Sequence, residues 1–155
     1  MQDHRKLQIW RMACALAIDV RAAVSRFPKR GYAELKAQMI SAAESIANTI
    51  VEGCGAESNK EFARFLSMSI KSNRELEGQL DLALGYRILA EQRWHELTQF
   101  TVLLRKKTYT LRKRALLSPS SGRPSGGSSR NPAAGKPRGD KWSPTPEPPT
   151  PNAEP

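Results

Sequence analysis

Six basic residues and no acidic residue fall in the segment RKKTYTLRKR, from Arg105 to Arg114. Lysines and arginines at this density can contact several phosphates of a nucleic acid, and an aromatic residue between them can stack on a base. The candidate nucleic-acid-binding residues of this segment are Arg105, Lys106, Lys107, Tyr109, Arg112, Lys113 and Arg114. Two other interpretations stay open, because cations near a helix C-terminus also interact favourably with the helix dipole and keep a protein soluble.

A second basic surface is predicted along one helix in the middle of the chain. Its cations are spaced so that they share one helix face, from which they can reach several phosphates along a nucleic-acid backbone. These candidate nucleic-acid-binding residues are Lys60, Arg64, Lys71 and Arg74. The alternative is a solvated helix face that the glutamates at positions 57, 61, 75 and 77 partly neutralise.

Few residues have the types and spacing that catalysis or metal binding requires. Glu52 has no second acid, histidine or metal-binding pattern near it, and His4 and His95 are isolated in the sequence. The sequence also lacks a Walker loop, a dinucleotide-binding glycine pattern and a nucleophile elbow. We therefore expect a non-enzymatic protein with no catalytic residue, metal or cofactor. Glu52 is expected to bond amides at the start of the next helix or to pair with an arginine.

Composition divides the chain near residue 117. Residues 1–117 hold nine of the ten aromatic residues and one proline, whereas residues 118–155 hold ten prolines with runs of glycine and serine. A segment so poor in apolar residues cannot offset the entropy that ordering it would cost. We expect a folded domain over residues 1–117 and a disordered tail over residues 118–155. Of the net charge of +10, +8 lies in residues 1–117, and this basic excess suggests an acidic partner.

The cysteines and the hydropathy of the chain suggest a cytoplasmic protein. The start, MQDHRKLQIW, has no apolar segment of the kind that a signal peptide requires, so Cys14 and Cys54 are expected to be free thiols in a reducing compartment. The chain contains no apolar run of roughly 18 residues that would cross a membrane. Two interpretations of Cys54, between Gly53 and Gly55, stay open: an exposed, reactive thiol in a glycine turn, or an inert thiol, which is the commoner case for a lone cysteine.

Apolar residues recur at spacings of three and four in four segments, which predicts four helices. The predicted helices span residues 6–27, 33–51, 58–84 and 91 to about 114. Gly31 is expected to take a positive φ after Pro28, and Gly53 and Gly55 are expected to reverse the chain in a left-handed conformation. Ser58 and Glu61 have the spacing of a capping box. Helices of similar length with short connections favour an all-α, antiparallel up-down-up-down four-helix bundle.

Two features of the predicted helices bear on packing and assembly. Ser69 and Asn73 fall on the inner stripe of the third helix, so they need partners across the core or at a subunit boundary. Apolar residues outside the narrow inner stripes are Ile9, Leu16, Ile18, Phe65, Met68, Phe100, Val102 and Leu103. A monomer rarely exposes so much apolar surface, and five bundles in a ring would cover it. A monomer with a wide core is the alternative.

The segments FPKRGYAELKAQMISAAESIANTIVEGCG and NKEFARFLSMSIKSNRELEGQLDLALGY resemble the four-helix bundle proteins encoded by intervening sequences of bacterial 23S rRNA genes. The resemblance covers about residues 7–111. The matching residues are Phe27, Pro28, Leu35, Gln38, Ser45, Ile46, Ile50, Glu52, Gly53, Lys60, Glu61, Phe62, Leu66, Ser72, Glu75, Leu76 and Glu77. The chain departs from the family pattern at Ile40 and Ser41, where two basic residues are expected, at Thr49 in place of an asparagine, and at Lys71 in place of a glycine.

This resemblance implies a small cytoplasmic helical bundle that is not an enzyme and forms a homo-oligomer, with a pentamer favoured. A related branch is the accessory variability determinant of diversity-generating retroelements, in which a basic pentamer binds a reverse transcriptase and nucleic acid. We therefore predict binding of RNA or DNA, with a reverse transcriptase as a further partner. The alternatives are a structural protein-interaction module whose charge is incidental and, as a weaker third class, an enzyme that uses Glu52.

Overall fold

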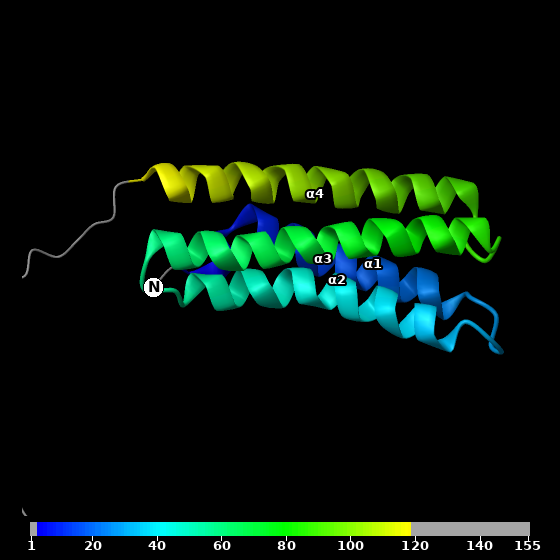
Figure 1. Cartoon of the computed structure of the whole chain (residues 1–155). Helices are drawn as coiled ribbons and strands as arrows, with labels where there is room; N and C mark the ends of the chain where they lie inside the picture. The colour runs from blue at the N-terminus through cyan, green and yellow to red at the C-terminus, as the bar shows by residue number, and fades with distance from the viewer. Residues whose placement is uncertain (1–2, 119–155) are drawn as a thin grey trace, which may run out of the picture. The chain divides into compact units, whose positions relative to one another are not determined.

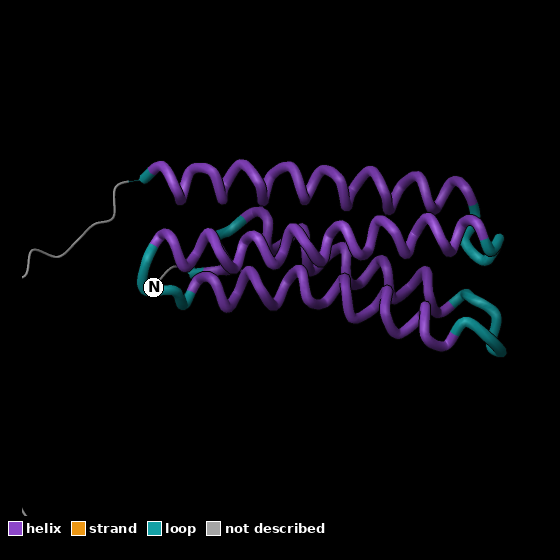
Figure 2. The backbone as a smooth tube through the Cα atoms, viewed as in Figure 1, coloured by secondary structure: helices purple, strands orange, loops and turns teal. Residues whose placement is uncertain are grey.

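The computed structural model describes residues 3–118, and these residues form four long helices after one short 3-10 turn (Figure 1). The elements are η1 (His4–Lys6), α1 (Gln8–Ser25), α2 (Ala33–Cys54), α3 (Asn59–Gly85) and α4 (Glu91–Leu117). No strand occurs between residues 3 and 118, and Figure 2 shows loops only at the two ends of the helices. The all-α prediction is confirmed. The predicted tail, residues 118–155, lies outside the described residues except for Ser118.

The four helices surround a common core as an antiparallel bundle. α1 and α3 each pack on both α2 and α4, whereas residues 3–118 provide no backbone contact across the diagonals α1–α3 and α2–α4. Consecutive helices run in opposite directions (Figure 1), as their short connections require. Packing is least extensive between α1 and α4. The predicted up-down-up-down topology is therefore confirmed.

The helix boundaries differ from the prediction mainly where local backbone geometry ends a helix. Leu7 is extended, with φ −78° and ψ 121°, so α1 begins at Gln8, two residues later than predicted. Before it, the Asp3 side chain accepts a hydrogen bond of 3.0 Å from the amide of Arg5 and caps η1. α2 continues three residues beyond the predicted end, through Gly53 and Cys54.

Gly53 allows two helices to approach closely, and the prediction that Gly53 and Gly55 adopt a left-handed conformation is wrong. Both have negative φ, whereas Gly31 has the predicted positive φ, 79°. A Cβ at Gly53 would lie 2.9 Å from Cβ of Phe65 and 3.0 Å from Cδ2 of Phe62. The glycine is therefore required by the packing of α2 on α3.

A pair of glycine substitutions tests this close approach. Gly53→Ala is expected to lower the free energy of unfolding by about 1–3 kcal/mol, because overpacking forces α2 and α3 apart. Gly78→Ala on α3, where an added Cβ meets no atom within 4 Å, is expected to raise it by roughly 0.5–1 kcal/mol through helix propensity. Chemical denaturation followed by circular dichroism measures both values. Stabilisation by both substitutions would contradict the close approach.

The N-terminus of α3 is capped largely as the sequence predicts. The Ser58 hydroxyl accepts a hydrogen bond of 3.1 Å from the Glu61 amide. The Glu61 carboxylate accepts one of 3.1 Å from the amide of Glu57, not from that of Ser58. The reciprocal bond of the capping box therefore forms one residue earlier than expected.

The predicted inner stripe of α3 is confirmed, since all seven of its members are buried: Phe62, Leu66, Ser69, Asn73, Leu76, Leu80 and Ala83. The Ser69 hydroxyl donates across the core to the carbonyl of Ile46 on α2, at 3.2 Å. Asn73 Nδ2 donates to the carbonyl of Ser69 in its own helix, at 2.9 Å. Asn73 Oδ1 has no hydrogen-bond partner within residues 3–118. The expected partner across the core thus exists for Ser69 and not for Asn73.

Burial corrects part of the predicted apolar excess. Ile9 and Leu16 belong to the core, because α1 contacts both α2 and α4 and therefore buries a wide face. Phe65, Phe100 and Val102 are half-buried. The exposed members are Ile18, Met68 and Leu103, on α1, α3 and α4. Only these three of the eight predicted residues are exposed, whereas Val51, Leu82, Leu116 and Leu117 are exposed outside that set. The pentamer stays a prediction.

Candidate nucleic-acid interface

The basic residues at the C-terminal end of α4 point in three directions, because successive residues of a helix are rotated by about 100°. Arg105 and Arg112 contact α3, and Lys107 contacts α1. Lys106 and Lys113 are exposed, and their ammonium groups make no hydrogen bond or ion pair within residues 3–118. The predicted cluster thus divides into internal contacts and free cations.

Arg105 forms an ion pair with Glu77 and is not free to bind phosphate. Its Nε donates to Glu77 Oε1 at 2.6 Å, and its Nη2 donates to Oε2 at 3.3 Å. The two side chains are only 24% and 22% exposed. The pair neutralises the charge of Arg105 within the bundle. The arginine fixes α4 against α3.

Arg112 lies in a groove between α3 and α4, where the two predicted basic surfaces meet. Its Nε donates to the Ser67 hydroxyl at 2.6 Å. The groove has a volume of about 540 Å³ and is lined by Ser58, Lys60, Glu61, Ala63, Arg64, Ser67, Arg112 and Leu116. Glu61 is its only acid, and one of its carboxylate oxygens bonds the Glu57 amide. Three cations from two helices thus line one groove.

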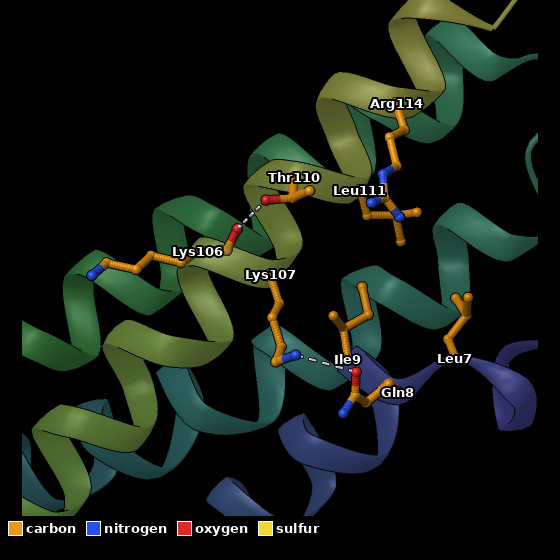
Figure 3. A pocket seen from close by; sticks show the side chains of 8 residues that line it. All are labelled: Leu7, Gln8, Ile9, Lys106, Lys107, Thr110, Leu111 and Arg114. Atoms are coloured by element: carbon orange, nitrogen blue, oxygen red, sulfur yellow. Dashed lines mark hydrogen bonds between the residues drawn. The ribbon is translucent and has the colours of Figure 1, made fainter.

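A second groove, of about 450 Å³, separates the start of α1 from the end of α4 (Figure 3). Lys107 Nζ donates across it to Gln8 Oε1 at 3.3 Å. Figure 3 shows Arg114 lying over Leu111, while Lys106 points away from Ile9. Leu7, Ile9 and Leu111 give this groove apolar walls. Three cations and no acid line it, namely Lys106, Lys107 and Arg114, and Lys107 already bonds Gln8. The cations of both grooves are exposed or half-buried.

The remaining cations of α3 face solvent. Lys71 Nζ lies 3.9 Å from Glu75 Oε1, an exposed pair of a kind that contributes little stability. Arg74 makes no side-chain hydrogen bond or ion pair within residues 3–118. The bonds from α4 to Ser67 and Glu77 set an antiparallel register that places Lys71 level with Tyr109, which is exposed.

We call the outer surface shared by α3 and α4 the basic face. Its members are Lys60, Arg64, Lys71, Arg74, Lys106, Tyr109, Arg112 and Lys113. Of the predicted residues, Arg105, Lys107 and Arg114 do not belong to it. Arg105 is paired with Glu77, and Lys107 and Arg114 line the groove beside α1. Lys106 borders that groove as well but points away from Ile9 (Figure 3).

Glu52 is exposed on α2, where it makes no hydrogen bond or ion pair within residues 3–118. The structural role predicted for it is therefore wrong, because Glu61 takes the amide before α3. His4 stacks edge-on against Trp10 at 4.7 Å, and His95 Nε2 lies 2.8 Å from Gln99 Nε2. No group of three His, Cys, Asp or Glu residues that could hold a metal occurs in the part of the chain that the structure describes.

Neither cysteine has the environment of a reactive thiol. Cys54 is the last residue of α2 and is buried, which favours the inert thiol over the exposed, reactive one. Burial raises the pKa of both the Cys14 and the Cys54 thiol, and the charge of Asp3 raises that of Cys54 further. Both thiols are free.

Sequence reasoning missed two tyrosines that the fold brings together. Tyr32 follows α1 and Tyr86 follows α3, and their ring centroids lie 5.6 Å apart. The signal was present as Arg-Gly-Tyr before one helix and Gly-Tyr-Arg after another. Without the topology, nothing in the sequence joins these two tripeptides.

None of the helices described for this chain has the length and apolarity that a bilayer crossing requires.

Comparison with known proteins identifies relatives of the chain. The family model described as 23S rRNA-intervening sequence protein matches residues 5–110. A similar fold occurs in a crystal structure of a protein of unknown function from the S23 ribosomal protein family of Bacteroides thetaiotaomicron VPI-5482, with a TM-score of 0.62 and 17% identity. The similarity covers 68% of this chain and 98% of that one. At this identity it shows the fold alone. No curated protein matches the chain.

Proposed function

We propose that this chain, which belongs to the 23S rRNA-intervening sequence protein family, binds nucleic acid through the basic face of α3 and α4. The observation that carries the proposal is the convergence of Lys60, Arg64 and Arg112 in one groove. Each comes from a segment that already suggested phosphate contacts in the sequence. A solvated face of a single helix would not place cations from two helices in the same groove.

The dimensions of the basic face suit a nucleic-acid backbone. From Lys60 to Arg74 the helix rises roughly 21 Å, which spans several phosphates of a single or double strand. Two cations of this region have acidic partners within the bundle. Glu77 neutralises the charge of Arg105, and Glu75 lies close enough to Lys71 for a weak, exposed ion pair. The exposed Tyr109 supplies an aromatic ring between the free lysines of α4, as sequence-tolerant binding of single strands favours.

We also propose that the chain assembles into a homo-oligomer. Ile18, Met68 and Leu103 are exposed on three different helices. Subunits in a ring contact one another through two different surfaces, so apolar residues on more than one face suit a ring better than a two-fold dimer. The family resemblance favours a pentamer, and a reverse transcriptase stays a proposed partner.

Titration of fluorescently labelled single-stranded RNA, followed by anisotropy, tests the nucleic-acid proposal. We expect binding that weakens as the salt concentration rises, because phosphate contacts release counterions. The second candidate is a protein-interaction module, which the exposed Ile18 favours. An oligomeric mass by light scattering without RNA binding at low salt would overturn the first proposal and support the second.

A further inference from the structure

We propose that Tyr32 and Tyr86 form a platform on which an unpaired base of a single-stranded nucleic acid stacks. The inference rests on the proposed nucleic-acid binding and assigns a second contact region to it. The platform lies where the loops 26–32 and 86–90 meet, at the end of the bundle opposite to the groove of Lys60 and Arg112 (Figure 1).

The two rings present an aromatic surface to solvent. Their centroids are 5.6 Å apart, their planes are inclined by 35°, and the residues are 40% and 52% exposed. Neither hydroxyl makes a hydrogen bond within residues 3–118. Aromatic residues usually stabilise a fold by burying their rings. Neither residue belongs to the buried core or packs against it as a partly buried residue, so core packing does not account for these rings.

The backbone at the platform is also costly to the fold. Tyr32 has φ 56° and Arg87 has φ 58°, and these are the only residues other than glycine with positive φ among residues 3–118. Such a conformation is unfavourable for a bulky residue. Tyr32 also occupies the N-cap of α2 without any side-chain capping bond, where serine, asparagine or aspartate would stabilise the helix. Local stability therefore does not explain a tyrosine at this position.

The charges around the rings suit a ligand that carries phosphate. The two loops contain four exposed cations, Arg26, Lys29, Arg30 and Arg87, and no acid. The ammonium group of Lys36 donates to the carbonyl of Pro28 and ties the first loop down. Glu34, the acid nearest in sequence to Tyr32, accepts a hydrogen bond from Gln38 Nε2. A nucleotide stacked on the rings would thus have cations near its phosphates.

The geometry favours an unpaired base over a duplex. Stacking requires the face of a base, and in a duplex the faces are covered except at the ends. A strand that follows α3 past Arg74 reaches Tyr86 after a further helix rise of roughly 18 Å. The platform and the basic face therefore fit one continuous single strand.

The test compares Tyr86→Ala with Tyr86→Phe, which keeps the ring. Tyr86 is chosen because its φ of −77° is unstrained and its side chain is exposed, so the bundle should stay folded, as circular dichroism would show. The ligands are a labelled single-stranded oligonucleotide and a blunt-ended duplex with the same total number of phosphates, at one salt concentration. We expect Tyr86→Ala to weaken single-strand binding roughly 5- to 100-fold and to leave duplex binding nearly unchanged, and we expect Tyr86→Phe to retain wild-type affinity.

The other outcomes separate this inference from the proposed function. If Tyr86→Ala and Tyr32→Ala both bind the single strand with wild-type affinity, the platform is overturned, but the proposed nucleic-acid binding is not. An equal loss on single strand and duplex also overturns it, because the bases of a fully paired duplex are not free to stack on the rings. Absence of binding by the wild-type protein overturns the platform together with the proposed function.

Discussion

Replacing Lys106 and Lys113 together by glutamate is expected to weaken binding of single-stranded RNA at least about 20-fold at 0.1 M salt. Each phosphate contact of a single strand releases roughly 0.7 of a counterion. The loss of two contacts therefore lowers the logarithm of the association constant by about 1.4 at this salt concentration. Charge repulsion adds to the loss. Both side chains are exposed and make no bond within residues 3–118, so the fold should be unaffected. Fluorescence anisotropy measures the change.

A control with the same change in net charge distinguishes a site from a general charge effect. Arg5 and Arg11 are exposed on η1 and α1, which contribute no residue to the basic face. The double variant Arg5→Glu/Arg11→Glu should therefore lose much less affinity than Lys106→Glu/Lys113→Glu. Equal losses in the two variants would mean that the protein binds RNA through its net charge, and not through α3 and α4.

Removing either partner of the ion pair between Arg105 and Glu77 is expected to lower the free energy of unfolding by about 1–3 kcal/mol. The pair is held by two hydrogen bonds and is largely shielded from water, so either substitution leaves a poorly solvated charge without its partner. Denaturation of Glu77→Gln, Arg105→Gln and the double variant would measure the coupling. The double variant should lose clearly less than the sum of the single losses.

The same variants separate a structural arginine from a phosphate-binding one. Arg105→Gln should bind RNA with nearly wild-type affinity under conditions where the variant is folded, because its guanidinium already pairs with Glu77. A loss as large as that of Lys106→Glu/Lys113→Glu would place Arg105 in the nucleic-acid site after all.

The family pattern also bears on where the basic surface lies. Ile40 and Ser41 stand where the resemblance leads us to expect two basic residues, and both line a groove on α2 together with Glu44 and Glu52. The lining of that groove contains two acids and no cation, and Glu44 pairs with Arg21 of α1 at 2.6 Å. Nucleic-acid binding in this chain therefore requires another surface, and we propose the basic face of α3 and α4.

Much of the fold could be predicted from the sequence because its determinants are local. The periodic apolar positions of α3 and the Ser58 cap depend on residues three or four apart, and the structure confirms them. Gly53 was misread because the atoms that require it belong to Phe62 and Phe65 on another helix. A local pattern of glycines indicated a turn, whereas helix packing determines the outcome.

The candidate site was harder to predict because it depends on contacts between helices that are distant in the sequence. The sequence shows which residues carry positive charge, but not which of them already have a partner. Arg105 meets Glu77 and Arg112 meets Ser67 only after α3 and α4 pack in one particular register. Tyr32 and Tyr86 come together only through the topology of two loops. Such contacts between distant segments decide which cations and rings stay free.

The salt dependence of RNA affinity tests the central claim most directly, with wild-type protein and Lys106→Glu/Lys113→Glu measured side by side. Six cations of the basic face form no ion pair within residues 3–118, namely Lys60, Arg64, Arg74, Lys106, Arg112 and Lys113. If all of them contact phosphates, the logarithm of the association constant should fall with the logarithm of the salt concentration with a slope of about −4, and with a slope shallower by about 1.4 in the variant. A wild-type slope near zero, or the same slope in both proteins, would contradict phosphate binding by the basic face.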